Sequence, residues 1–408
     1  MNERKVSRRD FMRTVGVVGV GSLVGTGRVL AQAAEQPVAP AKAGDAKVPL
    51  RTFGKTGVKV SSLALGGIFD ISSNQLQLKQ ALDWGVTYWD TASGYNGGKS
   101  ESGIGMYFDK NPEVRKSVFL VTKASGAHST DEMTKSLNQS FERMKTDYVD
   151  MFFLHGIPNT KDLTPEVKAW AEKAKADKKI RFFGFSTHSN MDQCLTEAVK
   201  LGWIDGIMLT YNYRVLNTDA MRAALDAAAK AGIGLTAMKT QAKRQQTAAT
   251  DAEAKLLQHF LGRGFTQEQA CLKAVWESPQ IAALCSQMAN LTILSSNVAA
   301  SLDKTALTAA DKAALEQHAE ATCSFYCAGC TRLCEAALGG QLPLGDVMRS
   351  LMYHHGYDDR DLSRSVLANL PEPVRQRLGK IDYAAAERAC PHRMPIAALM
   401  NEAAGLLA

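Results

Sequence analysis

From Arg51 onward, short apolar runs alternate with amphipathic stretches, and this alternation restricts the possible folds more than any other feature. The apolar runs, such as MFFLH at 151–155, are nearly continuous rather than alternating in polarity. Strands with that pattern are covered on both faces, as in a parallel sheet. The pattern therefore predicts eight buried strands, at 62–66, 87–91, 118–123, 151–155, 182–186, 206–211, 234–238 and 281–286.

Helical stretches, in which apolar residues recur at spacings of three and four, separate the predicted strands. Eight strands, each followed by a helix, over roughly 250 residues are typical of a closed (β/α)8 TIM barrel. A doubly wound sheet is the alternative, although it rarely contains eight strand–helix units. The polar stretch 240–264 follows the seventh strand, and we expect either a lid over the active site or a surface helix there. The predicted helices include 130–144, 164–176, 191–201, 219–231 and 266–277.

The N-terminal segment has the features of an export signal. SRRDFMR at 7–13 is followed by a Gly-rich apolar run at 15–24 and by the small-residue cleavage pattern Ala-Gln-Ala at 31–33. The apolar run is shorter than the ~20 residues of a membrane helix, so we expect no stable membrane span after cleavage. The segment resembles a twin-arginine signal, which implies the twin-arginine export machinery as a partner and a periplasmic location. An uncleaved anchor or a basic tail is the alternative.

The positive charge of the chain is concentrated in this same segment. Of the net charge of +7, the six basic and two acidic groups of residues 1–33 account for +4, which leaves +3 for the remainder. The remainder contains no basic tract of the kind that binds nucleic acid. We therefore expect no nucleic-acid partner.

Four titratable side chains lie at the carboxyl ends of neighbouring predicted strands. Asp90 ends the second strand, Tyr95 lies in the loop that follows it, Lys123 ends the third strand and His155 ends the fourth. In (β/α)8 barrels the active site lies at this end of the strands. Taken singly, each residue is more often a cap or a surface group. Together they predict an active site at the mouth of the barrel.

Residues 51–300 resemble an aldo-keto reductase. The resemblance is carried by RTFGKTGVKVSSLALGG at 51–67, GVTYWDTASGYNGGKSESGIG at 85–105 and FERMKTDYVDMFFLH at 141–155. It implies a nicotinamide cofactor, NADP(H) or NAD(H), and a small carbonyl or alcohol substrate. It also implies a catalytic tetrad made of Asp90, Tyr95, Lys123 and His155.

The chemistry of carbonyl reduction agrees with such a tetrad. A carbonyl that accepts a hydride develops negative charge on its oxygen and needs a proton donor. Tyrosine is a weak acid, with an ordinary pKa of about 10. We expect Lys123 to lower the pKa of Tyr95 and Asp90 to keep Lys123 charged and in place. We expect His155 to orient the carbonyl by donating a hydrogen bond.

The resemblance carries over only some of the cofactor contacts. The stretch after the eighth strand, at 286–300, contains no Lys or Arg, whereas the 2′-phosphate of NADP is usually bound by a cation. The choice between NADP and NAD therefore stays open. The contacts that the resemblance implies are Ser186 and Thr187 against the carboxamide, Tyr211 stacked on the nicotinamide, Asn212 beside it, Lys239 in an A-M-K turn, and Asn297.

Beyond residue 310 the chain becomes helical and rich in cysteine. Cys327, Cys330 and Cys334 have the spacing C-x2-C-x3-C, and Cys390 is followed by a proline. This pattern resembles the helical ferredoxin-like tail of some aldo-keto reductases. The resemblance implies a single [4Fe–4S] cluster bound by these four thiols, with Cys323 as an alternate ligand.

Two other uses of the cysteines stay open. A zinc site accepts four thiolates, and His354, His355 or His392 could take part in it. Disulfides are common in periplasmic proteins. The three remaining cysteines fall within predicted barrel elements, where we expect them to pack in the interior: Cys194, Cys271 and Cys285.

The sequence thus predicts an exported oxidoreductase of the aldo-keto reductase type. Its parts are a signal peptide at 1–33, a linker at 34–49, a (β/α)8 barrel at 50–305 and a helical iron–sulfur-like domain at 306–408. The twin-arginine route carries folded proteins, which suits a cluster inserted before export. One alternative is an iron–sulfur protein that passes electrons to a partner and uses the barrel as a scaffold. Another is a barrel that binds ligands without catalysis.

Overall fold

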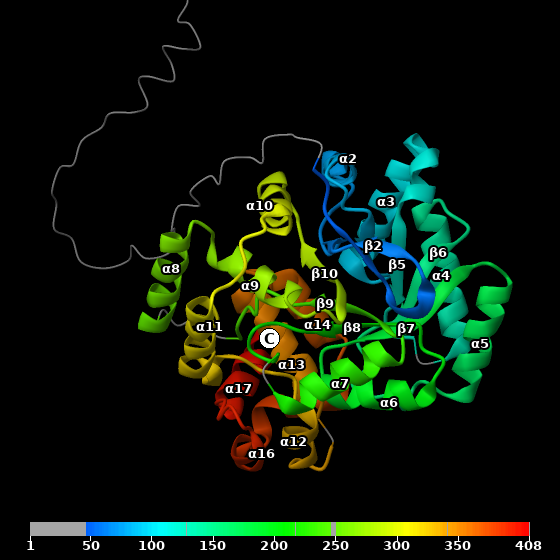
Figure 1. The fold of residues 1–408 in the computed structure, drawn as a ribbon. Coiled ribbons are helices and arrows are strands. Elements are labelled where there is room, and N and C mark those ends of the chain that lie inside the picture. Colours follow the sequence, from blue (N-terminus) through cyan, green and yellow to red (C-terminus); the bar gives the residue numbers. More distant parts are fainter. Residues whose placement is uncertain (1–45, 128, 217, 246–249, 341, 408) are drawn as a thin grey trace, which may run out of the picture. The chain divides into compact units, whose positions relative to one another are not determined.

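The computed structural model describes residues 46–407, apart from 128, 217, 246–249 and 341. The predicted signal at 1–33 and residues 34–45 of the predicted linker lie outside the described residues. The barrel and the C-terminal helices fall within one compact unit of the chain (Figure 1).

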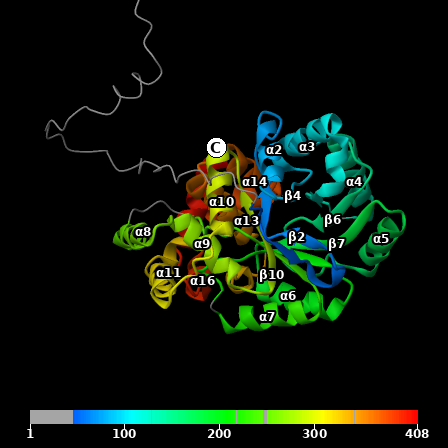
Figure 2. The same ribbon diagram turned by 45° about the horizontal axis from the view of Figure 1, so that its top comes forward.

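Eight parallel strands close into a barrel in the order β10-β3-β4-β5-β6-β7-β8-β9 (Figures 1 and 2). The predicted (β/α)8 barrel is therefore confirmed, and the doubly wound alternative is excluded. The strands are β3 (Leu63–Gly66), β4 (Tyr88–Asp90), β5 (Phe119–Ala124), β6 (Val149–Leu154), β7 (Ile180–Thr187), β8 (Gly206–Thr210), β9 (Gly234–Met238) and β10 (Ile281–Gln287).

A hairpin of β1 (Leu50–Thr52) and β2 (Lys59–Ser61), with the short helix η1 (Gly54–Thr56) at its turn, closes the amino end of the barrel. Its Phe53 is fully buried in the interior cluster of the barrel. A Cβ on Gly234, the first residue of β9, would lie 2.4 Å from the Phe53 ring, so this strand start has no room for a side chain. The open end of the barrel is therefore the carboxyl end.

The helices that follow the strands cover the outside of the barrel. Most begin at a residue whose side chain accepts a hydrogen bond from the first turn; in α4, for example, Ser129 accepts from Glu132 N at 3.2 Å. The helices are α2 (Gln75–Asp83), α3 (Lys99–Lys110), α4 (Thr130–Met144), α5 (Pro165–Ala176), α6 (Met191–Leu201), α7 (Asp219–Lys230), α9 (Gln267–Trp276) and α10 (Leu291–Leu302), with the short η2 (Tyr95–Gly98) and η3 (Pro112–Ser117) between them.

The polar stretch 240–264 contains helix α8 (Asp251–Arg263), which begins at a capping box formed by Thr250 and Glu253. His259 and Arg263 of α8 both contact the buried carboxylate of Asp311, at 2.7 and 3.2 Å. Asp311 belongs to α11 (Ala309–Ala321), so α8 packs on the C-terminal helices. Of the two expectations for this stretch, these contacts favour the surface helix.

The described part of the C-terminal extension consists of helices and the loops between them, and it has its own apolar core. That core includes Leu344, Val347, Tyr383 and Met400, all of them buried. After α11 its elements are η4 (Cys323–Phe325), α12 (Thr331–Ala336), α13 (Leu344–Leu351), η5 (Met352–Gly356), α14 (Arg360–Ala368), α15 (Glu372–Arg377), η6 (Leu378–Lys380), α16 (Ala384–Ala389) and α17 (Ile396–Leu407).

This extension packs against the carboxyl end of the barrel. Asn190, in the loop after β7, donates its backbone N–H to the Gly329 carbonyl at 2.7 Å, and its side chain accepts from Arg332 N at 2.9 Å. Gln245, in the loop after β9, accepts from Cys327 N at 2.9 Å. The extension thus lies over the end of the barrel where the active site is expected. Within the described part of the chain, no helix has the length and apolar character needed to cross a membrane.

Candidate active site at the carboxyl end of the barrel

The four residues predicted as a tetrad lie together at the mouth of the barrel. Lys123 Nζ lies 2.6 and 2.7 Å from the two carboxylate oxygens of Asp90, and both side chains are almost completely buried. The same ammonium lies 3.3 Å from the Tyr95 hydroxyl. The rings of Tyr95 and His155 meet edge to face, with centroids 5.5 Å apart. One ion pair, one phenol and one imidazole therefore share one site.

Strand register explains why these residues converge. Asp90 of β4 pairs with Val121 of β5, and Lys123 lies two residues further along β5. Lys123 in turn pairs with Phe153 of β6, and His155 lies two residues beyond it. Since side chains two residues apart point to the same face of a strand, each step keeps the side chain inside the barrel and raises it toward the mouth.

Burial shifts the pKa values of this cluster. Burial raises the pKa of Asp90 above its ordinary value, although Lys123 opposes the shift. Burial and the charge of Asp90 raise the pKa of Tyr95 well above 10. The expectation of a lowered pKa for Tyr95 is therefore wrong. The reason is that burial, the largest cause of the shift, disfavours the phenolate, and the negative charge of Asp90 acts in the same direction.

The imidazole of His155 is shifted in the opposite direction. Burial, followed by the charges of Lys123 and Arg349, holds its pKa well below 6.5, so His155 is neutral at pH 7. Its Nδ1 lies 2.6 Å from the Ser125 hydroxyl. If that hydroxyl donates to Nδ1, the ring proton lies on Nε2. Sequence reasoning missed Ser125, whose signal was its position two residues beyond Lys123.

A buried polar network supports the site from the outside. Arg143 of α4 donates to the Ser93 carbonyl at 2.9 Å and to the buried Glu101 carboxylate at 3.1 Å. Thr122 of β5 donates to the same carboxylate at 2.6 Å. This network links the loop that carries Tyr95 to strand β5, which carries Lys123. It therefore fixes the position of the Tyr95 phenol relative to the Lys123 ammonium.

Three of the predicted cofactor contacts use their polar side chains within the barrel. The Ser186 hydroxyl accepts from Gly156 N at 2.9 Å, and the Thr187 hydroxyl donates to the Ser189 carbonyl at 2.8 Å. Asn297 donates to the Ser286 hydroxyl at 3.0 Å.

Tyr211 does not lie over the mouth of the barrel. Its ring is buried in the apolar layer that the outer helices share, and its hydroxyl lies 2.8 Å from that of Ser278 in the α9–β10 loop. The stacking position expected for Tyr211 is therefore not the one that it occupies in this structure.

The remaining two predicted contacts are engaged by the C-terminal extension. Asn212 donates to the Tyr326 hydroxyl at 2.8 Å. Lys239 donates to the Tyr353 hydroxyl at 3.1 Å, and its ammonium lies 4.4 and 5.1 Å from the ring centroids of Tyr353 and Tyr357. These two side chains can contact a nicotinamide only if their hydrogen bonds to the hydroxyls of Tyr326 and Tyr353 are broken.

Four of the cysteines of the extension line one small cavity. All of them are free thiols. Pro391 and His392 complete one wall, whereas Cys323 lies outside the lining. Among the described residues, no three of these sulfur atoms lie within 4.8 Å of one another, so the thiols are spaced too widely to hold a single ion together. The lining cysteines are the predicted ligands Cys327, Cys330, Cys334 and Cys390.

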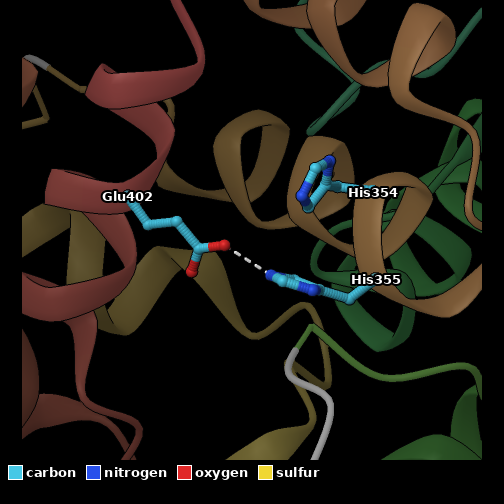
Figure 3. Close-up of side chains that lie close together, drawn as sticks. All are labelled: His354, His355 and Glu402. Carbon is cyan, nitrogen blue, oxygen red and sulfur yellow. Dashed lines mark hydrogen bonds and ion pairs between the residues drawn. The ribbon is translucent and has the colours of Figure 1, made fainter.

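Two of the three histidines considered for a zinc site, His354 and His355, lie elsewhere. His355 Nε2 lies 2.5 Å from a carboxylate oxygen of Glu402 on α17, with His354 beside it (Figure 3). One ligand atom from each of the three lies within 4.8 Å of the others. Among the described residues, this is the one His, Cys, Asp and Glu group close enough to hold a single ion, and it contains no cysteine. A mixed Cys–His zinc site with His354 or His355 is therefore not formed.

The cysteines of the barrel differ in their surroundings. Cys194 and Cys271 are buried in the layer between the barrel and its helices, as expected for packing residues, and burial raises the pKa of each to about 12. Cys285 of β10 packs against the interior of the barrel instead. Burial, followed by the charge of Asp90, raises the pKa of its thiol well above the ordinary value. It is therefore a neighbour of the active site that sequence reasoning missed.

Comparisons with known proteins agree with this geometry. The sequence profile described as "Aldo/keto reductase family" matches residues 64–311. L-galactose dehydrogenase of Arabidopsis thaliana is 26% identical over 206 residues, which cover 46% of this chain and 64% of that protein. "Aldo-keto reductase yakc [NADP(+)]" of Schizosaccharomyces pombe is 30% identical over 156 residues, 36% of this chain and 44% of that protein. The chain thus spans less than two thirds of the length of these relatives.

A solved structure shares the fold. An aldo-keto reductase from Bacillus halodurans, in its holo form, superposes with a TM-score of 0.56 at 21% identity. The superposition covers 66% of this chain and 96% of that one. At this level of identity the likeness concerns the barrel fold alone.

Proposed function

The chain belongs to the aldo/keto reductase family, and on that premise we propose that it reduces a small carbonyl compound, or oxidises the corresponding alcohol, with NADP(H) or NAD(H). The observation that carries the proposal is the buried Asp90–Lys123 pair, whose ammonium lies 3.3 Å from the Tyr95 hydroxyl beside His155. The printed name of the Schizosaccharomyces pombe relative includes NADP(+), which supports a nicotinamide. When bound, the nicotinamide supplies or accepts the hydride.

The four residues of the tetrad transfer the proton and position the reacting groups. Tyr95 gives its hydroxyl proton to the carbonyl oxygen, on which negative charge develops. Lys123 stabilises the phenolate left on Tyr95, and Asp90 holds Lys123 in place. His155, neutral and with Nδ1 toward Ser125, directs Nε2–H at the same oxygen. Each of these groups is positioned before the substrate arrives, so little reorganisation is needed.

The pKa of Tyr95 suits its role as the acid in carbonyl reduction. Because burial raises this pKa well above 10, the phenol is protonated over the whole neutral range and is ready to act as an acid. Oxidation of an alcohol needs the phenolate as a base, a form that is scarce under the same conditions. The net direction of turnover is set by the concentrations of the substrates and the cofactor, not by this pKa.

Replacing Tyr95 with phenylalanine tests the proposal. Loss of the acid should lower the rate of carbonyl reduction by about 10²- to 10⁴-fold, measured as oxidation of the reduced nicotinamide. Tyr107→Phe, on α3 and away from the mouth, is the control and should keep the parent rate. Unchanged turnover in Tyr95→Phe would remove the mechanism.

We further propose that the extension holds one [4Fe–4S] cluster through Cys327, Cys330, Cys334 and Cys390. The support is that these four free thiols line one cavity. When bound, such a cluster supplies one-electron transfer. Anaerobic purification followed by an iron and sulfide assay tests the assignment; a chain that binds neither iron nor sulfide would contradict it.

Export by the twin-arginine route to the periplasm is part of the same proposal. It is supported by the SRRDFMR pattern at 7–13 and by the cleavage pattern at 31–33. Cell fractionation of the protein and of an Arg8→Lys, Arg9→Lys variant tests it. The parent should be found in the periplasmic fraction, and the variant should remain in the cytoplasm.

A second candidate function, electron transfer, is favoured by one observation. Cys327 lines both the cysteine cavity and a cavity at the mouth of the barrel, while the extension engages Asn212 and Lys239. In this alternative, electrons reach the barrel from the cluster. Titration with NADPH separates the two candidates, since tight binding favours the first and a reducible chromophore without nicotinamide affinity favours the second.

A further inference from the structure

The C-terminal extension brings an arginine to the mouth of the barrel. Arg349 lies on α13, and a Cβ on Gly156 would lie 3.5 Å from its Nη1. Gly156 directly follows His155 of the tetrad. A residue almost two hundred positions away in sequence therefore places its guanidinium against the backbone next to the candidate catalytic imidazole.

Arg349 also lines a small pocket at this mouth. Lys239, His188 and Thr210 contribute polar groups from the barrel, and Met348 and Met352 contribute apolar walls from the extension. The lining contains no Asp or Glu among the described residues. The cavity is thus polar and cationic on one side and apolar on the other.

Three cations lie near the mouth, Lys123, Lys239 and Arg349, and they differ in how far nearby carboxylates neutralise them. Asp90 neutralises Lys123 at 2.6 Å. Lys239 contacts a tyrosine hydroxyl and two aromatic rings, and no carboxylate of the described residues forms an ion pair with it. Arg349 is paired through Nη2 with Asp346, which is 44% exposed, at 3.0 Å. Nη1 lies toward the barrel. A net positive field therefore acts on the cavity.

The charge of Arg349 also acts on groups of the active site. The charge of Arg349 contributes to a lowered pKa of His155 and of His188, after burial. It acts in the same direction on Tyr353, whose pKa falls because Lys239 and Arg349 together outweigh its burial. The guanidinium is therefore electrostatically part of the mouth rather than of the outer surface.

We propose that this cavity binds the carboxylate of an anionic carbonyl substrate, with Arg349 and Lys239 as its ligands. Guanidinium groups bind carboxylates through paired hydrogen bonds, and an ammonium adds a second charge. Met348 and Met352 pack on the apolar part of the substrate. The carbonyl then faces Tyr95 and His155. This inference rests on the proposed function for the reaction itself, but the binding of the anion does not depend on turnover.

A matched pair of substrates tests the inference. Phenylglyoxylate carries a carboxylate beside its ketone, and its methyl ester is neutral but otherwise alike. The parent protein should have the lower KM for the acid. In Arg349→Gln the KM for the acid should rise about 10- to 100-fold, since a charge-assisted hydrogen bond is lost. Its kcat should change less than about twofold, because the carboxylate is bound alike in ground and transition states. The ester should be turned over as before.

Two further variants keep the test decisive. Arg364→Gln, on the exposed surface of α14, removes the same charge and should leave both substrates unaffected. Arg349→Lys keeps the charge without the paired donors and should recover part of the affinity for the acid. If Arg349→Gln does not fold, a raised KM for the acid alone in Arg349→Lys carries the test. An equal KM for acid and ester in the parent, or equal losses for both in the variants, overturns the inference.

Calorimetric titration with phenylglyoxylate, without nicotinamide, separates this inference from the proposed function. If no carbonyl compound is reduced but the acid binds the parent and binds Arg349→Gln about tenfold or more weakly, the anion site stands and the proposed function fails. If the ester is reduced but the acid neither binds nor is preferred, the proposed function stands and the anion site fails.

Discussion

Replacing Lys123 with methionine removes the cation that neutralises Asp90, and the structure gives the expected size of the effect. Both side chains are almost completely buried, and the ammonium lies 2.6 Å from the carboxylate. Removing one partner of such a pair leaves an uncompensated buried charge and costs about 3–5 kcal/mol of folding free energy. Methionine has a similar length, so little packing is lost with the charge.

The loss should depend on pH in a definite direction. Without Lys123, burial raises the pKa of Asp90 further, because nothing opposes it. The folded protein then binds a proton that the unfolded chain has already released above its ordinary carboxyl pKa of about 4. Stability of the variant therefore falls as the pH rises through the folded-state pKa, and the deficit is larger at pH 8 than at pH 5.

Urea unfolding followed by far-ultraviolet circular dichroism at these two pH values measures the effect. Lys79→Met is the matched control, because Lys79 and Asp83 form a pair of similar length, 2.7 Å, in which the side chains are 62% and 48% exposed. Solvent screens that exposed pair, so it should contribute little to stability. If the free energy of unfolding at pH 8 falls no more in Lys123→Met than in Lys79→Met, the buried pair does not stabilise the site.

Three further predictions concern protons, thiols and the cofactor. The rate of alcohol oxidation should keep rising with pH up to about 10, because the raised pKa of Tyr95 means that the phenolate fraction still grows over this range. A plateau near pH 7 in the pH–rate profile would contradict this. Cys330→Ala should reduce the iron content of anaerobically purified protein, whereas Cys271→Ala, a buried barrel cysteine, should keep it; equal iron in both would contradict the ligand assignment. Tyr326→Phe frees Asn212 from its 2.8 Å hydrogen bond and should tighten NADPH binding about 2- to 10-fold in a fluorescence titration; weaker binding would mean that Tyr326 assists the cofactor.

The barrel was predictable from the sequence because its signal is periodic and local. Continuous apolar runs such as 151–155 predict strands buried on both faces. In the helices between them, apolar residues recur every three to four positions. The tetrad was predictable for a related reason: Asp90, Lys123 and His155 each follow a run, and parallel strands present their carboxyl ends together. Periodicity therefore placed these residues without any knowledge of tertiary contacts.

The rest of the site depends on contacts that periodicity does not encode. Arg349 and Tyr353 lie on helices whose sequence pattern shows an apolar face but not the surface on which it packs. Arg349 lies near Gly156, and Tyr353 accepts a hydrogen bond from Lys239. In each case the two residues are more than a hundred positions apart in the sequence. The pKa of Tyr95 was mispredicted because a motif shows the neighbouring ammonium but not the burial, which dominates the shift.

Tyr211 illustrates the same limit at a single position. It directly follows strand β8, where a side chain can turn into the mouth or toward the outer helices. The hydroxyl of Ser278 in the α9–β10 loop lies 2.8 Å from its own, which holds the ring on the outer side.

The central claim, that the mouth of the barrel transfers a hydride from nicotinamide to a carbonyl, is tested most directly by isotope transfer. The parent protein is supplied with NADPH deuterated at the reactive position and with a ketone, and the alcohol is analysed by mass spectrometry. We expect one deuterium on the carbinol carbon. An alcohol that carries only solvent hydrogen at that carbon would contradict the account, because the electrons would then have come by another route.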